Sequence, residues 1–198
     1  MLKVGLTGGI GSGKSTIAKV IEAMGYPVFY SDTEAKKIIE TNHNVKIKLV
    51  QHFGAGICTE NSIDRKKLAQ IVFSHAENLE TINSIIHPEV RNHFNKWAEK
   101  QKVKVVFNEA AILFETGAYR KLDKNIVVIA PEVIRLDRVM KRDNLSKEEV
   151  LKRIHNQWSD DLKTPLADYI VTNDNQQPIL IQLEKIIQDL TLVEKQVS

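Results

Sequence analysis

Cysteine is nearly absent from this 198-residue sequence, which contains Cys58 and no other. A single thiol cannot form an intrachain disulfide, and it cannot supply the several thiolates of a zinc cluster. The six histidines are scattered along the chain and do not fall at the spacing of metal ligands. The sequence therefore excludes a disulfide scaffold and predicts no zinc module.

Long hydrophobic runs and a strong charge of one sign are also missing. No apolar stretch approaches the roughly 20 residues of a membrane span, and Lys3 and Gly5 interrupt the first apolar run, which argues against a signal peptide. The formal net charge of +3 is too small to indicate nucleic-acid binding, although it is compatible with a local basic site for phosphates. The composition is ordinary for a globular protein, so we expect one cytoplasmic domain, 1–198, with no nucleic-acid or membrane partner. No heptad repeat or broad apolar face predicts an oligomeric state.

Glycine is sparse, but four of the nine glycines stand within residues 8–13. The sequence GGIGSGKS at 8–15 fits the pattern G-x-x-x-x-G-K-[ST] of a phosphate-binding P-loop. It follows a strand-like run at 2–6 and precedes a helical pattern at 15–24, which is the context that this motif needs. Backbone N–H groups converge on phosphate in such a loop, while Lys14 would reach the β- and γ-phosphates and Ser15 would ligate Mg²⁺. The motif therefore predicts binding of a nucleoside triphosphate.

Five short apolar runs predict buried parallel strands, at 2–6, 27–30, 103–107, 125–129 and 169–172. Because helical patterns separate them, the sequence predicts an α/β fold, a five-stranded parallel sheet with helices on both faces. Ligands of such sheets bind at the carboxyl ends of the strands. The core of this three-layer P-loop fold would comprise residues 1–32, 100–131 and 166–198.

Two blocks interrupt this core. Residues 33–99 hold several helical patterns and predict a helical insertion for a second substrate, with a plain structural extension as the alternative. Within it, Pro88 restricts His87 and predicts a local turn. Residues 132–165 predict a helical lid, with Pro131 opening one helix and a capping box at 146–149 opening another that runs to about residue 158.

Three arginines lie at helical spacing in this second block: Arg135, Arg138 and Arg142. Positions separated by three and seven residues share one face of a helix. Beside a P-loop, such a face suggests a lid that closes over polyphosphate. A solvated helical hairpin would have a similar sequence and is the alternative.

The small size, the helical insertion and the absence of a guanine-reading Asn-Lys-x-Asp motif favour a small-molecule kinase. Asp32 is our candidate to accept the proton of the attacking hydroxyl, because a capping box between Ser31 and Glu34 would leave its carboxylate free. The alternative is that Asp32 itself caps the helix. Glu109, at the end of the third strand, could hold the Mg²⁺ shell through water or could be an ordinary surface residue.

Along nearly its whole length the chain resembles the dephospho-coenzyme A kinase family. The resemblance rests on TGGIGSGKST at 7–16, Ser31-Asp32, the runs 63–65, 72–73, 86–88 and 113–115, and Arg138, Arg142, Gln157, 167–168 and Asn173. Three positions depart from the family pattern. Glu109 stands where the family has Asp, Arg135 where it has Gln, and Ile129 where an aspartate is common.

The resemblance implies transfer of the ATP γ-phosphoryl group to the 3′-hydroxyl of dephospho-coenzyme A, the last step of coenzyme A synthesis. Asp32 would be the base, Lys14 would hold the donor, Arg138 and Arg142 would neutralise developing charge, and Arg65 and His87 would hold the acceptor. Another small-molecule or nucleoside monophosphate kinase, or a non-catalytic ATP-binding switch, is the alternative. The resemblance implies the following ATP-binding residues: Gly8, Gly9, Ile10, Gly11, Ser12, Gly13, Lys14, Ser15, Thr16 and, on the adenine side, Asn173.

Overall fold

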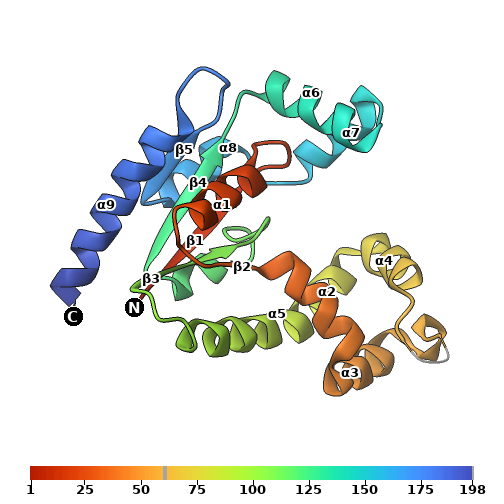
Figure 1. Cartoon of the computed structure of the whole chain (residues 1–198). Helices are drawn as coiled ribbons and strands as arrows, with labels where there is room; N and C mark the ends of the chain where they lie inside the picture. The colour runs from red at the N-terminus through yellow and green to blue at the C-terminus, as the bar shows by residue number, and fades with distance from the viewer. Residues whose placement is uncertain (60–61, 198) are drawn as a thin grey trace. The chain divides into compact units, whose positions relative to one another are not determined.

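The computed structural model describes residues 1–59 and 62–197, and gives the backbone alone for residues 73, 76 and 195–197. A parallel sheet of five strands forms its centre, in the order β2-β3-β1-β4-β5 (Figure 1). The strands are β1 (Leu2–Gly8), β2 (Val28–Tyr30), β3 (Val105–Glu109), β4 (Lys124–Ile129) and β5 (Tyr169–Thr172). All five predicted strands are confirmed, with ends that differ by up to two residues. β1 runs to Gly8 because Thr7 and Gly8 still pair with β4.

One face of the sheet is covered by the helices α1 (Lys14–Ala23) and α9 (Ile179–Val197). The alternating residues of the strands pack there against Ile17, Ala18 and Ile21 of α1, all fully buried. Full burial of a side chain of this kind contributes about 1.5–3 kcal/mol relative to exposure. Leu180 of α9 lies outside this core, since the residue is 51% exposed.

The opposite face of β1 is approached closely by the chain that follows β3. A Cβ at Gly5 would lie 2.5 Å from Leu113 Cδ2 and 2.5 Å from Asn125 Oδ1. Leu113 and Phe114 are buried there, and the ring of Phe114 meets Tyr119, in η2 (Ala118–Lys121), edge to face at 5.1 Å. Glycine at position 5 is therefore needed for this close approach.

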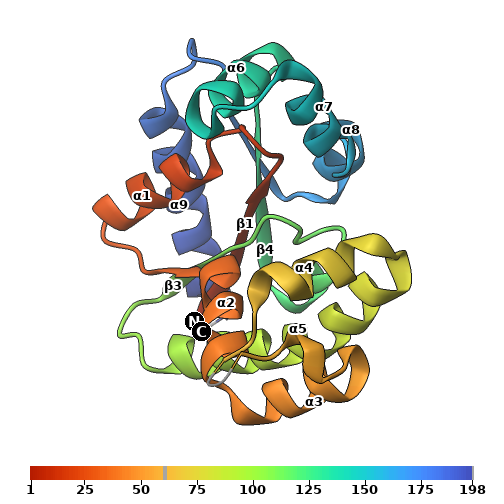
Figure 2. The ribbon, with the colours of Figure 1, turned by 90° about the vertical axis from the view of Figure 1, so that its right-hand side faces the viewer.

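The helices at one end of the sheet belong to residues 131–166: α6 (Glu132–Asp143), α7 (Lys147–His155), α8 (Asp160–Lys163) and η3 (Thr164–Leu166). The predicted capping box is confirmed, because Glu149 N donates to Ser146 Oγ at 3.3 Å and Ser146 N donates to Glu149 Oε2 at 2.8 Å. The helix ends at His155, earlier than predicted. Val139 and Val150 pack with Ile10 of the P-loop, so α6 and α7 lie beside the loop that follows β1 (Figure 2).

Residues Ser31–Glu99 form a separate compact unit made of helices. It contains α2 (Ser31–Thr41), α3 (His43–Phe53), η1 (Ala55–Ile57), α4 (Arg65–Ser74) and α5 (Ala76–Glu99). The long helix α5 packs against α2, α3 and α4. The predicted turn at Pro88 is wrong, because this proline lies inside α5 and the helix continues through it. Helical packing on several sides overrides the preference of an isolated proline for a helix end.

Among the described residues, no helix combines the length and the apolar character that a membrane span needs.

Candidate active site

The P-loop joins the carboxyl end of β1 to the amino end of α1. Gly11 has φ +78° and Gly13, the N-cap of α1, has φ +90°, a left-handed backbone that favours glycine. The loop is closed by a hydrogen bond from Ser12 N to Gly9 O at 3.0 Å. Because α1 begins at Lys14, the loop presents the positive end of the helix dipole, a suitable place for an anion.

A cavity of about 430 Å³ lies over this loop. A volume of this size fits a nucleotide-sized ligand. Gly8, Gly9, Ile10, Gly11, Gly13, Lys14, Ser15 and Thr16 line it from the loop and from α1, and Ala111, Arg138, Val139, Arg142 and Gln157 line it from the remaining segments. Ser12 is fully buried and is not part of this lining.

Lys14 and Glu109 form an ion pair at the base of the loop. β3 pairs with β1 so that Glu109 is in register with Leu6, two residues before the loop. Glu109 is 5% exposed and belongs to the strand, so the alternative that it is an ordinary surface residue is wrong. The pair keeps the ammonium group of Lys14 beside the cavity with its charge balanced.

Arg138 and Asn173 bind the same part of the P-loop from two different segments. Arg138 Nη1 donates to Ser12 O at 3.3 Å and to Gly11 O at 3.4 Å, and Asn173 Nδ2 donates to Ser12 O at 2.8 Å. Arg138 Nη2 also donates to Asn173 Oδ1 at 3.2 Å and to Asn175 Oδ1 at 2.6 Å. Asn173, in the segment after β5, is therefore buried against the loop.

The three arginines of α6 do not share one role. Arg138 and Arg142 line the cavity, whereas Arg135 is buried outside its lining, with Nε donating to Ile10 O at 3.0 Å. Arg142 is 62% exposed in its side chain and pairs with Asp143, whose hydrogen bond raises the pKa of that guanidinium. Because Arg135 is buried, it does not lie on the solvent-exposed face of a helical hairpin, and that alternative is wrong for this residue.

Gln157, Asp160 and Lys163 also contribute to this site, although only Gln157 stood out in the sequence, through the family resemblance. Gln157 accepts a hydrogen bond from Ile10 N at 2.7 Å. Lys163 is fully buried and pairs with Glu115 at 2.9 Å. In the sequence, Glu115 follows two apolar residues, in the run 113–115 on which the family resemblance partly rests. That position is the signal that the sequence offers for the ion pair.

The remaining predicted site residues belong to the unit Ser31–Glu99. An N-cap residue directly precedes its helix, whereas Ser31 is the first residue of α2. Asp32 lies in the first turn of this helix. The carboxylate of Glu34 accepts from Lys37 at 2.7 Å and pairs with His93 at 3.2 Å. Asp32 follows Tyr30 by two residues, and Tyr30 is in register with Glu109.

His87 lies half-buried on α5, and the negative charge of Asp32 affects its pKa. Burial and the charge of Arg91 lower the pKa of His87, and the charge of Asp32 opposes them. Arg65 is the first residue of α4 and pairs with Glu40 at 3.2 Å. The unit thus places Asp32 and His87 on two packed helices, with Arg65 at the start of a third.

In the part of the chain that the structure describes, protein side chains alone do not build a metal site. Among the described residues, no three or more His, Cys, Asp or Glu side chains gather where they could hold an ion. A hydroxyl at Ser15, which lines the cavity, and a buried carboxylate at Glu109 nonetheless fit Mg²⁺, since this ion keeps several waters and is shared with substrate phosphates.

A parallel sheet in this order, a P-loop after its first strand and two cavity-lining arginines define a P-loop kinase. The family model for dephospho-CoA kinase matches residues 2–178. This chain belongs to the dephospho-CoA kinase family.

Relatives and solved structures agree with this assignment. The dephospho-CoA kinase of Bacteroides fragilis (strain YCH46) is 35% identical over 187 residues, which cover 94% of this chain and 91% of that protein. The structure of TT1252 from Thermus thermophilus superposes with a TM-score of 0.84 at 34% identity, over 95% of this chain and 96% of that one. The structure of a dephospho-CoA kinase from Campylobacter jejuni gives a TM-score of 0.68 at 29% identity, over 99% and 98% of the two chains.

Proposed function

We propose that this protein transfers the γ-phosphoryl group of ATP to the 3′-hydroxyl of the ribose of dephospho-coenzyme A, the final step of coenzyme A synthesis. The observation that carries the proposal is the family match over residues 2–178, which includes the P-loop and its cavity. Because the donor is ATP, we infer a cytoplasmic location.

On the donor side, the loop amides and Lys14 would hold the triphosphate. Phosphoryl transfer needs positioning and charge neutralisation more than covalent chemistry from the protein. Arg138 and Arg142 line the same cavity, and Arg142 has an exposed guanidinium that can turn from Asp143 to an incoming phosphate. These two arginines would stabilise the negative charge that develops during transfer.

Ser15 and Glu109 would hold the magnesium ion, Ser15 directly and Glu109 through water. When bound, Mg²⁺ neutralises phosphate charge and orients the β- and γ-phosphates. Entry of the triphosphate would supply Lys14 with new anionic partners and release Glu109 for this second role. The buried position of Glu109 beside Lys14 supports this exchange.

On the acceptor side, Asp32 would take the proton of the 3′-hydroxyl as its oxygen forms a bond to the γ-phosphorus. The bond from that phosphorus to the β–γ bridging oxygen then breaks, and ADP leaves with the electron pair. His87, whose pKa is lowered by burial, and Arg65 would bind the acceptor in the unit Ser31–Glu99.

A coupled ADP-release assay tests the acceptor, with dephospho-coenzyme A, AMP, CMP and shikimate offered in parallel. We expect fast turnover with dephospho-coenzyme A, and phosphorus NMR of the product should place the new phosphate on the 3′-oxygen. Faster turnover with any other acceptor would reject the assignment.

Asp32→Asn tests the proposed base in the same assay. We expect kcat to fall by at least about 100-fold, since general-base catalysis contributes factors of that size, while ATP still binds. A decrease of less than about tenfold would show that Asp32 is not the base.

A further inference from the structure

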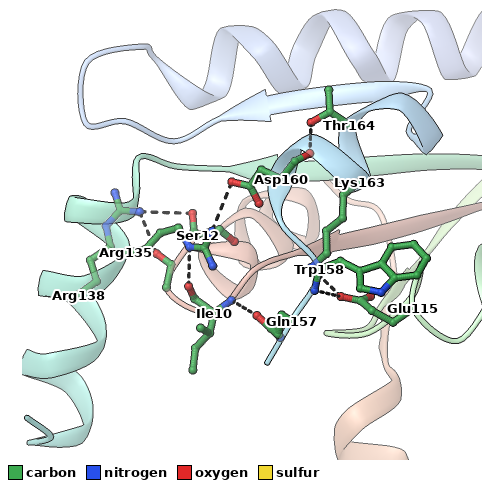
Figure 3. Close-up of polar contacts among 11 residues, drawn as sticks. Ile10, Ser12, Glu115, Arg135, Arg138, Gln157, Trp158, Asp160, Lys163 and Thr164 are labelled. Carbon is green, nitrogen blue, oxygen red and sulfur yellow. Dashed lines mark hydrogen bonds and ion pairs between the residues drawn. The ribbon is translucent and has the colours of Figure 1, made fainter. Parts of the chain in front are cut away.

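Ile10, in the middle of the P-loop, is held on both sides of its backbone by side chains of residues 131–166 (Figure 3). Its N–H donates to Gln157 Oε1 at 2.7 Å, and its carbonyl accepts from Arg135 Nε at 3.0 Å. Both partners lie more than 120 residues away along the sequence. The conformation of the loop therefore depends on contacts that the P-loop motif itself does not contain.

Arg135 also occupies the space above two glycines of the loop. A Cβ at Gly9 would lie 2.8 Å from Arg135 Cζ, and a Cβ at Gly11 would lie 2.5 Å from the Arg135 carbonyl oxygen. Gly9 does not have the positive φ of Gly11 and Gly13, so its backbone conformation is open to other residues. An alanine methyl at position 9 would meet the guanidinium and push it away from Ile10.

A counter-charge holds the buried guanidinium in this place. Arg135 Nη1 pairs with Asp160 Oδ2 at 3.5 Å, and the side chain of Arg135 is 7% exposed. Asp160 Oδ1 is buried and receives no hydrogen bond from the described residues. A buried charge is stable only when it is paired, so the position of Asp160 decides where the guanidinium can stay.

Asp160 is itself fixed by its surroundings. It begins α8, and three residues later the fully buried Lys163 pairs with Glu115 at 2.9 Å. Glu115 also accepts a hydrogen bond from Trp158 N at 3.4 Å, just before α8. Figure 3 shows Asp160, Lys163, Trp158 and Glu115 near Ile10 and Ser12 of the P-loop. The segment that carries Gln157 and Asp160 is thus anchored to the core of the protein.

We propose that Arg135 is a positioning residue that acts with Gln157 to hold the Ile10 peptide, so that the loop is pre-formed for the triphosphate of ATP. Asp160 holds Arg135 in turn. The inference deepens the proposed function and rests on its ATP site, but it does not depend on the identity of the acceptor. Removing the guanidinium should weaken binding of ATP and leave the chemical step nearly unchanged once ATP is bound.

Arg135→Met and Gly9→Ala, alone and combined, test the proposal through the Kd of Mg²⁺–ATP, measured by calorimetry. The methionine keeps the apolar stem and removes the guanidinium, whereas the alanine displaces the guanidinium without changing Arg135. Each single variant should raise the Kd about tenfold. The double variant should bind ATP no more weakly than either single variant, because both substitutions remove the same interaction. If the two factors multiply in the double variant, the proposal is wrong.

Lys141→Met is the matched control, since Lys141 is an exposed cation on the same helix and pairs with Asp137. Its Kd should stay within about twofold of the parent, as expected for a surface pair. The kcat of Arg135→Met at saturating ATP should stay within about threefold of the parent, because pre-organisation affects binding more than chemistry. If Arg135 had only a structural role, Arg135→Met would have a lower melting temperature but would bind Mg²⁺–ATP with the Kd of the parent. That outcome would overturn the proposal.

Asp160→Asn provides a second route if Arg135→Met does not fold. This variant keeps the shape of the side chain and removes the charge that holds Arg135, so the Kd of ATP should rise about threefold or more. An unchanged Kd would contradict the proposal. If the parent protein binds ATP and shows these effects but does not phosphorylate dephospho-coenzyme A, the proposed function fails and the inference stands.

Discussion

Lys14 and Glu109 form an ion pair, and this pairing links the P-loop to the neighbouring strand. Lys14 begins α1 and Glu109 ends β3, and both side chains are largely buried at the base of the cavity. A triphosphate that enters the loop must therefore replace a carboxylate that is already there. We therefore expect Glu109 to weaken ATP binding when Mg²⁺ is absent and to strengthen it when Mg²⁺ is present.

Glu109→Gln should have opposite effects with and without magnesium. With EDTA present, the loss of the competing negative charge should tighten ATP binding at least about twofold, since like charges placed side by side oppose binding. With Mg²⁺, the same variant should bind ATP more weakly, because a carboxylate of the ion's hydration shell is lost. Calorimetric Kd values in the two buffers check this. Glu22→Gln, an exposed carboxylate on α1, is the control. A change in the same direction in both buffers would show that Glu109 does not hold the ion.

Asn173→Ala should both destabilise the protein and weaken ATP binding. The side chain is buried and donates to Ser12 O, so its loss leaves that carbonyl with the longer bond from Arg138 Nη1 at 3.3 Å, at a cost of about 0.5–1.5 kcal/mol. Asn175→Gly is a matched control, because Asn175 accepts from the same arginine but is exposed, and its φ of 65° suits glycine. Urea denaturation and the KM for ATP should separate the two variants. Equal effects of both substitutions would contradict the role of Asn173 as an anchor of the loop.

Much of this donor site was predictable from the sequence, because its signals are local. The glycine spacing of the P-loop and the apolar runs of the strands depend on neighbouring residues, and the structure confirms them. The capping box at Ser146 and Glu149 is a local signal of the same kind.

The contacts that hold the loop from outside were not predictable in the same way. Arg135 and Gln157 meet Ile10, and Arg135 meets Asp160, through tertiary folding, and nothing in their own segments predicts these contacts. Helical spacing placed Arg135 on one face with Arg138 but could not show that only one of them lines the cavity. Pro88 is a similar case, since packing around α5 decides its conformation.

His87 predicts a pH dependence of stability in the unit Ser31–Glu99. Burial lowers its pKa in the folded protein below the ordinary 6.5, so the unfolded chain binds more protons in acid. The stability linked to His87 is therefore complete above pH 6.5 and is lost as the pH falls through that value toward the lower, folded pKa.

Unfolding free energies of the parent and of His87→Gln, measured from pH 7.5 to pH 5, check this. The parent should lose more stability than the variant as the pH falls, while His52→Gln, an exposed histidine, should follow the parent. Parallel curves for the parent and His87→Gln would contradict the account of His87.

Every role proposed for the donor site depends on binding of the ATP triphosphate by the loop amides and Lys14. Calorimetry with Mg²⁺–ATP on the parent protein and on Lys14→Ala tests it most directly. We expect one site per chain in the parent and a loss of affinity of about 100-fold or more in Lys14→Ala, because a charge-assisted contact to phosphate is removed at the base of the cavity. No measurable binding by the parent, or equal binding by the two proteins, would contradict the account.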